Sequence, residues 1–72
     1  MKIDQLQQKI GQRIRELRES KGIPQQNLAA DCDFEKANLS RIEAGRTNPT
    51  ISTLYKISQA LGITISELVD VE

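Results

Sequence analysis

Apolar residues recur every three or four positions along the first part of the chain. This spacing is typical of one face of an α-helix, and it runs through Ile3, Leu6, Ile10, Ile14 and Leu17. Asp4 and Gln7 have the spacing of a capping box, and Gly22 before Ile23 is a favourable C-terminal cap. We therefore predict a first helix over residues 5–21. Gly11 inside it costs about 1 kcal/mol relative to alanine, which indicates close packing against a neighbour.

The pattern of residues 23–45 predicts two short helices joined by a tight turn. Pro24 suits the start of a helix over residues 25–32, because its missing N–H costs little there. Asp33 stands in the turn, where aspartate tolerates a left-handed backbone. Glu35 precedes a helix over residues 36–44 that Gly45 ends, and its charge suits a helix N-terminus. The inward positions of this helix-turn-helix frame are Leu28, Ala29, Cys32, Phe34, Leu39 and Ile42.

Two more helices follow. Thr50 is placed to cap a helix over residues 51–61 that Gly62 ends, and its predicted buried face consists of Ile51, Leu54, Ile57 and Leu61. Thr64 and Glu67 have capping-box spacing, which predicts a short helix over residues 65–69. No strand pattern or repeat is present. The expected fold class is all-α, a compact five-helix arrangement in which residues 1–72 form a single helix-turn-helix domain with a limited core.

Charge is balanced overall but uneven along the chain. Ten basic and ten acidic residues give a net charge of zero, which argues against nucleic-acid binding driven by bulk charge. The segment from residue 36 to residue 56, however, contains one acidic residue, Glu43, and four basic residues: Lys36, Arg41, Arg46 and Lys56. Asp31, Asp33 and Glu35 precede this segment, and they would weaken binding to phosphates unless their side chains turn away.

Several classes of function are disfavoured. The chain has no histidine and one cysteine, Cys32, so neither a disulfide framework nor a common metal cluster is expected. Cys32 is expected to be a small core residue in a protein of a reducing compartment. No nucleophile elbow or glycine-rich phosphate loop is present, so we expect no enzyme and no cofactor. The polar N-terminus and the lack of a long apolar run lead us to expect a cytoplasmic protein.

Several segments together resemble the Cro/C1-type (lambda-repressor-like, XRE) helix-turn-helix DNA-binding family. They are residues 25–29, 38–45 and 48–50, with further similarity at 12–18, 21–23, 60–63 and 67–68. The resemblance covers nearly the whole chain. It implies a five-helix fold, a phosphate-contacting glutamine at Gln25, and an ion pair between Arg18 and Glu43 that ties the first helix to the third.

The outer side of helix 36–44 carries the residues expected to read bases: Lys36, Ala37, Asn38 and Arg41. Arginine pairs bidentately with guanine, asparagine with adenine, and alanine touches a thymine methyl group. Phosphate contacts are expected from Gln25, Gln26, Arg46, Thr47 and Asn48. The alternative for both sets is plain solvent exposure on a helix face and in an ordinary loop.

These observations predict a sequence-specific regulator of transcription, a repressor, that binds double-stranded DNA through helix 36–44. A palindromic operator and a homodimer are expected, since one small domain reads few base pairs. Apolar residues in the C-terminal segment are expected to be jointly exposed and to form the dimer contact: Ile63, Ile65, Leu68, Val69 and Val71. The alternative is that Ile65, Leu68 and Val71 close the core of the monomer. The alternative is a protein-interaction module, such as an antitoxin or a regulatory partner, with the same fold.

Overall fold

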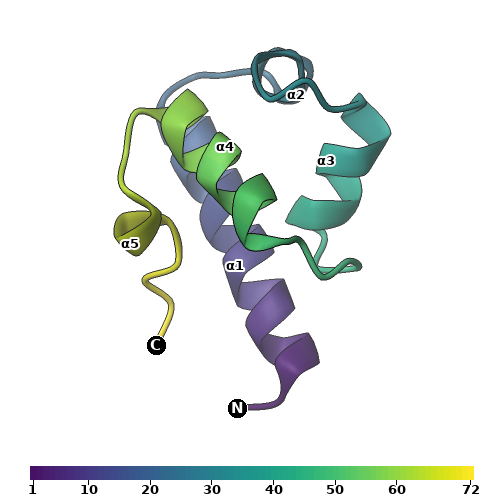
Figure 1. The fold of residues 1–72 in the computed structure, drawn as a ribbon, viewed down its shortest axis with the longest axis vertical. Helices are drawn as coiled ribbons and strands as arrows, with labels where there is room; N and C mark the ends of the chain where they lie inside the picture. The colour runs from purple at the N-terminus through teal and green to yellow at the C-terminus, as the bar shows by residue number, and fades with distance from the viewer.

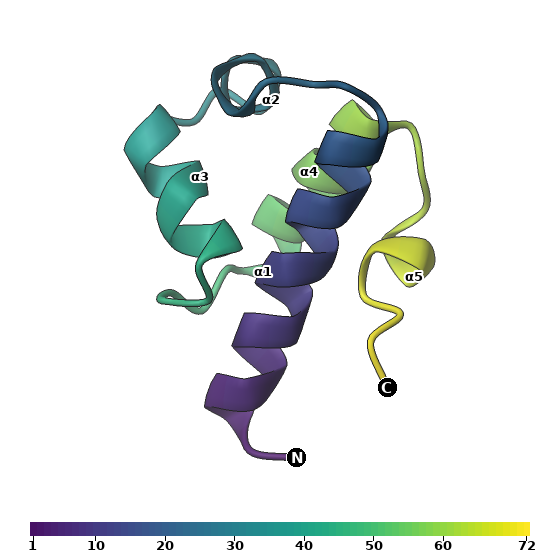
Figure 2. The same cartoon turned by 180° about the vertical axis from the view of Figure 1, so that it is seen from behind.

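Five α-helices and no strand make up the computed structural model, which describes residues 1–72. The helices are α1 (Ile3–Ser20), α2 (Gln25–Asp31), α3 (Lys36–Glu43), α4 (Ile51–Leu61) and α5 (Ile65–Leu68). In Figure 1 the long α1 runs down the molecule, α4 lies in front of it, and α2 and α3 lie above and to one side. The opposite view in Figure 2 shows α1 in front of α4, with α5 and the C-terminus on the far side from α3. The all-α, five-helix expectation is confirmed.

Side chains define the beginnings of α4 and α5 as the sequence predicts. The Thr50 hydroxyl accepts a hydrogen bond from the Thr53 N–H at 3.2 Å. At α5, the Glu67 N–H donates to the Thr64 hydroxyl and the Thr64 N–H donates to Glu67 Oε1, each at 3.1 Å. This reciprocal pair holds the pKa of the exposed Glu67 carboxyl below its ordinary value, chiefly because the ionised form accepts the Thr64 N–H.

The start of α1 differs from the prediction. The helix begins at Ile3, because the Lys2 N–H finds an acceptor in Gln5 Oε1 at 3.0 Å. The predicted capping box at Asp4 and Gln7 is therefore wrong. At the other end α1 stops at Ser20, and Gly22 adopts a left-handed conformation with φ of 68°. The glycine cap is confirmed: Gly22 follows the C-cap residue Lys21, and the helix ends one residue earlier than predicted.

Two positions show why the chain needs its particular residues at helix contacts and turns. Asp33, between α2 and α3, has φ of 60°, the left-handed backbone expected of it. Gly11 lies against the end of α3: a Cβ atom there would meet the carbonyl oxygens of Ile42 and Glu43, the latter at 2.7 Å. The close packing predicted from a glycine inside α1 is confirmed, and it lets α1 touch the backbone of α3.

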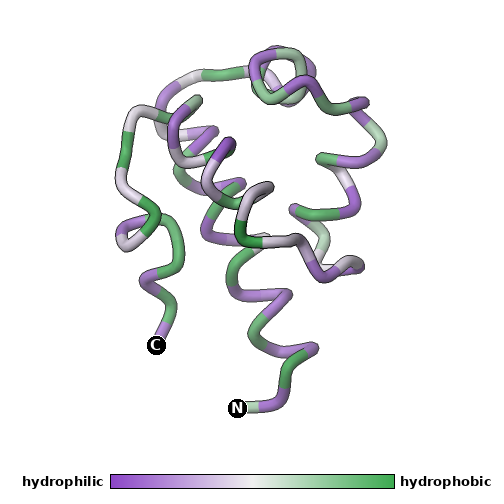
Figure 3. The backbone as a smooth tube through the Cα atoms, viewed as in Figure 1, coloured by the Kyte–Doolittle hydropathy of each residue, from purple (hydrophilic) through white to green (hydrophobic).

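All five helices contribute to one apolar core. Figure 3 shows hydrophobic positions alternating with hydrophilic ones along the helices. The buried apolar residues are Ile14, Leu28, Ala29, Cys32, Leu39, Ile42, Leu54, Ile57, Leu61 and Leu68. Burial raises the pKa of the Cys32 thiol, as expected of a core cysteine. Ile51 was predicted to be buried but is 78% exposed. The buried face of α4 includes Ser58, which leaves Ile51 at its edge in the first turn.

The C-terminal segment has less free apolar surface than its composition predicts. Leu68 is fully buried, and Ile63, Ile65 and Val69 pack against the core. The half-buried Val71 borders a shallow groove with Leu6 and Ile10 of α1. The Arg13 guanidinium of α1 donates two hydrogen bonds to the Glu67 carbonyl, at 3.0 and 3.1 Å. The expected joint exposure of the C-terminal apolar residues is therefore wrong, because α1 and the core take up most of their surface.

Candidate nucleic-acid interface

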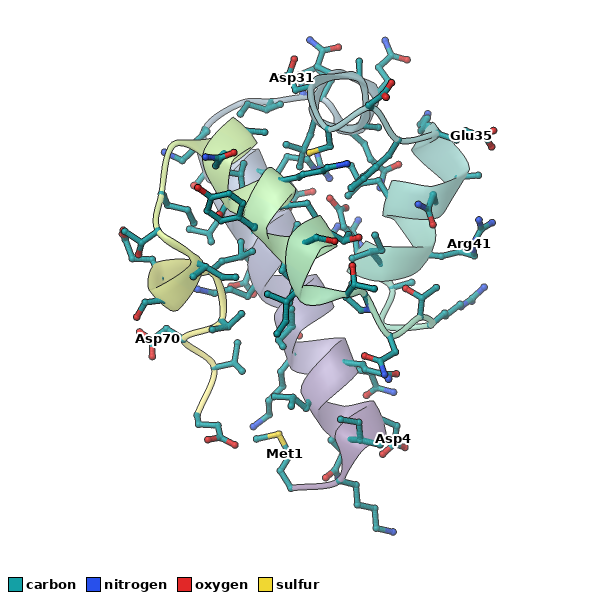
Figure 4. All side chains as sticks on the ribbon, viewed as in Figure 1. Met1, Asp4, Asp31, Glu35, Arg41 and Asp70 are labelled. Carbon is teal, nitrogen blue, oxygen red and sulfur yellow. The ribbon has the colours of Figure 1, made fainter.

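The outward face of α3 is polar, basic and free of the core. Leu39, Ile42 and Glu43 are buried, and they fix which side of the helix faces inward. The exposed residues of the helix and its cap are Lys36, Ala37, Ser40, Arg41 and Ala44. Figure 4 shows Arg41 projecting from α3 away from the rest of the molecule. The major groove of B-DNA admits an α-helix, and the basic and small side chains on this exposed face suit contacts with base edges there.

Asn38 and Ser40 lie on opposite flanks of the outward face of α3. Successive residues of an α-helix are about 100° apart, so the buried positions 39, 42 and 43 place Ser40 beside the outward face and Asn38 on its other flank. Asn38 is accordingly half-buried, whereas Ser40 is exposed. Ser40 was missed because a serine between Leu39 and Arg41 carries no distinctive signal until the inward side is known. It belongs to the candidate reading surface.

A buried polar network holds α3 against α1 and α2. Arg18 Nε donates to Glu43 Oε2 at 2.8 Å and its Nη2 donates to Oε1 at 3.2 Å, which confirms the predicted ion pair. Arg18 Nη1 also donates to the Ile23 carbonyl at 2.8 Å. The hydrogen bond with Glu43 is the main reason why the pKa of Arg18 is raised. No buried side-chain polar atom lacks a partner, so the network fixes the angle of α3 without an uncompensated charge.

Gln25 is part of this network. Its side-chain amide donates to Glu43 Oε1 at 3.0 Å, and the side chain is half-buried. The sequence predicts a glutamine free to meet a phosphate, whereas the structure commits one of its two amide hydrogens to the protein. The other amide hydrogen remains, and the neighbouring Gln26 is exposed. No side chain caps the start of α2, whose N-cap residue is Pro24.

A polar cleft of about 500 Å³ lies where α1, α2 and α3 meet. Lys36 and Ser40 of α3 line it together with Gln25 and Gln26, and Arg15 of α1 completes it. The Arg15 side chain is 62% exposed and lies 3.4 Å from Glu19. Sequence reasoning missed Arg15, since only the packing of α1 against α3 brings it to the reading side.

The loop after α3 begins directly at the reading helix. The Arg46 N–H donates to the Arg41 carbonyl at 3.0 Å, and Gly45 is left-handed with φ of 74°. Arg46 and Asn48 are exposed and Thr47 is half-buried. The predicted phosphate-binding loop therefore has two freely accessible polar side chains next to the outward face of α3.

The three acids before α3 do not share one direction. Asp31 and Asp33 border a hollow with Lys56 and Gln59 of α4, and no residue of α3 lines it. Lys56 Nζ lies 5.9 Å from the centre of the Phe34 ring in the same region, a cation–π distance. Glu35 and Arg41, in contrast, project to the same side in Figure 4. Only one of the three acids thus stands beside the basic face.

Known proteins share this fold and much of its sequence. The helix-turn-helix model HTH_3 matches residues 14–68. An uncharacterised helix-turn-helix transcriptional regulator, y4dJ of Sinorhizobium fredii, is 43% identical over 60 residues, which are 83% of this chain and 78% of the relative.

Two solved structures are also similar. One is the restriction-modification controller protein C.AhdI of Aeromonas hydrophila, 36% identical with a TM-score of 0.83 over 85% of this chain and 92% of that one. The other is SinR, a master regulator for biofilm formation crystallised with DNA. It is 40% identical with a TM-score of 0.78 over 85% of this chain and 98% of that one.

Proposed function

Since the chain belongs to the helix-turn-helix family and is a DNA-binding transcriptional regulator, we propose that it represses transcription by reading a palindromic operator with α3. The observation that carries this proposal is the exposed basic face of α3, held at a fixed angle by the buried pair of Arg18 and Glu43. A preset angle matters because bases are read only when several side chains reach their edges together. The proposal requires neither an enzymatic activity nor a cofactor.

Base reading is assigned to the outward side chains of α3. Arg41 pairs with guanine O6 and N7, and Lys36, five residues earlier at the start of α3, addresses the same kind of acceptor on another base. Ala37 touches a thymine methyl group, and the Ser40 hydroxyl donates to or accepts from a neighbouring base. Asn38, half-buried on the flank, reaches an adenine only at the edge of the groove. A good bidentate pair discriminates between bases by about 1–3 kcal/mol.

Residues near the two ends of α3 are assigned the contacts with phosphates on the two sides of the groove. Gln25, Gln26 and Arg15 lie around the cleft beside its start, and Arg46, Thr47 and Asn48 form the loop after its end. With a net charge of zero, the protein depends on these local contacts rather than on its overall field.

A palindrome and a homodimer follow from the size of the reading surface. One eight-residue helix reads only a few base pairs, and a second copy doubles the contacts when half-sites lie about 34 Å apart. All five helices share one core, which supports residues 1–72 as one domain. The C-terminal segment predicted to join two copies is mostly packed on that core.

Binding-site selection from random duplexes tests the function. The wild type is expected to enrich a palindrome, and Arg41→Ala is expected to lose preference at one position in each half-site while keeping the rest. Lys21→Ala is the matched control, because Lys21 is an exposed cation at the end of α1 that does not line the cleft beside α3. A uniform loss of affinity in Arg41→Ala would move Arg41 to the phosphate contacts. No enrichment by the wild type would favour a protein-interaction module, for which the exposed acids Asp31 and Asp33 provide a surface.

A further inference from the structure

The N-terminal half of α1 lies beside the end of α3. A Cβ atom on Gly45, the second residue after α3, would come within 2.6 Å of the Gln8 Cα atom, so the two backbones touch there. Two exposed glutamines, Gln8 and Gln12, line a hollow with Ala44 at the end of α3. Arg15 lines both this hollow and the polar cleft beside the start of α3. We call Gln8, Gln12 and Arg15 the α1 row; it runs from the loop after α3 to the cleft.

The α1 row lies on the side of α1 that faces away from the core. Gly11 touches the backbone of α3. At about 100° per residue, Ile14 lies about 60° from Gly11 on one side of α1, and Gln8 lies about 60° from it on the other. Ile14 is in the core, so Gln8 is turned from it. Arg15 is on the same side as Gln8, and it reaches the cleft that Lys36 of α3 also lines. The row therefore lies beside the exposed residues of α3.

The acids next to the row are engaged by its own side chains. Glu19 lies 3.4 Å from Arg15, and Glu16 accepts a hydrogen bond from the Gln12 amide at 3.0 Å. An arginine has five N–H donors and a glutamine amide has two, so both side chains keep donors for a further acceptor. These contacts do not involve Gln8, whose amide is free. The row therefore presents hydrogen-bond donors although two carboxylates border it.

Charged residues near Gln8 set the extent of this surface. Lys9 is exposed and lines a hollow with Gln8 and Gln12, so a cation stands beside the row. Asp4, four residues before Gln8, is an exposed acid that projects to the same side as Arg41 in Figure 4. Because a carboxylate repels a phosphate, the donor surface ends at Gln8.

We propose that the α1 row binds the phosphate backbone of one DNA strand, with Gln8 and Gln12 extending the contact assigned to Arg15. The proposal rests on the proposed function, because it adds contacts to DNA that α3 reads. Glutamine side chains donate to phosphate oxygens and position a protein without selecting a sequence. The row is continuous with the cleft and the loop assigned to phosphates. The HTH_3 model matches residues 14–68, so both glutamines precede the matched region, on turns of α1 that continue back to Ile3.

The double variant Gln8→Ala with Gln12→Ala tests the proposal. Alanine favours the helix and removes both donors. Affinity for the selected operator is expected to fall on the order of 10-fold, because hydrogen bonds to a charged group are lost. Base preference should stay unchanged, and a hydroxyl-radical footprint should lose protection at one end of each half-site. Gln59→Ala is the matched control, because Gln59 is an exposed glutamine of α4 in a hollow without α3 residues; it should bind as the wild type does.

A gain of binding keeps the test independent of folding. Gln8→Lys should raise affinity and steepen the salt slope by about one, because one more phosphate is neutralised, whereas Gln59→Lys should leave the slope unchanged. An alanine double variant that binds like Gln59→Ala would overturn the proposal, as would equal slopes for the two lysine variants. If the wild type enriches a palindrome while the glutamine variants bind it unchanged, only the α1 row is refuted. If the wild type enriches no DNA, the proposed function itself is refuted.

Discussion

Removal of the Glu43 carboxylate should destabilise the protein more than any other change to a charged side chain. Arg18 makes three hydrogen bonds, two of them to Glu43 and one to the Ile23 carbonyl. In Glu43→Ala the guanidinium stays buried with one acceptor, and the Gln25 amide loses its partner. The side chains of Arg18 and Glu43 are only 10% and 3% exposed, so water replaces the lost contacts poorly.

The expected cost follows from this burial. Breaking a buried ion pair by removing one partner costs about 3–5 kcal/mol, because an uncompensated charge remains inside. Folded domains are stable by about 5–15 kcal/mol, and small ones lie near the lower end. Glu43→Ala should therefore lower the urea midpoint severely and unfold a substantial share of the protein at physiological temperature.

The chain offers a matched control for the assay. Arg15 and Glu19 form an exposed pair at 3.4 Å, with side chains 62% and 55% exposed, and Arg15→Ala should cost less than about 1 kcal/mol. Arg15 is the partner to replace, because Glu19 also lies 3.9 Å from Arg18. Replacing both buried partners, as Arg18→Met with Glu43→Leu, should cost less than the single change Glu43→Leu, because no charge is then left alone. If urea unfolding shows Glu43→Ala no more costly than Arg15→Ala, the buried network does not hold α3 in place.

Three further predictions address packing, charge and pH. Gly11→Ala should destabilise the protein by about 1–2 kcal/mol in urea unfolding, although alanine favours helices by about 1 kcal/mol, because its Cβ meets α3 carbonyl oxygens; a more stable variant would contradict the close packing. Arg46→Ala should weaken binding to all sequences alike and lower the salt slope by about one, measured by isotherms at several salt concentrations; an unchanged slope excludes a phosphate contact. Because its pKa is lowered in the folded state, Glu67 contributes stability above its ordinary value of 4.5, and this is lost as pH falls through the folded pKa. Glu67→Gln should therefore lose less stability than the wild type on acidification below about pH 4.5, and parallel pH profiles would contradict this.

Local chemistry in the sequence determined where the helices lie. Thr50 and the pair of Thr64 and Glu67 act through contacts three residues apart, so their capping was predictable without knowledge of the fold. Asp33 likewise has the left-handed backbone that its place in the turn demands. The start of α1 was misplaced because two possible capping boxes with the same spacing lie there, one at Lys2 and Gln5 and the other at Asp4 and Gln7. The earlier box forms, through the Gln5 side chain.

Tertiary packing alone decided which side of each helix is free. Periodicity placed Ile51 in the core and Asn38 on the reading face, but each lies near the boundary of its helix face, where the neighbouring helix decides burial. The same packing brought Arg15 from α1 beside Lys36 and Ser40, and bound Gln25 to Glu43. These pairs are 18 to 25 residues apart, and no spacing rule relates them. The sequence alone therefore determined the helices and the family, because these depend on short-range patterns. Only the folded chain determined the composition of the reading face and the free surface of α4, because these depend on which helices pack together.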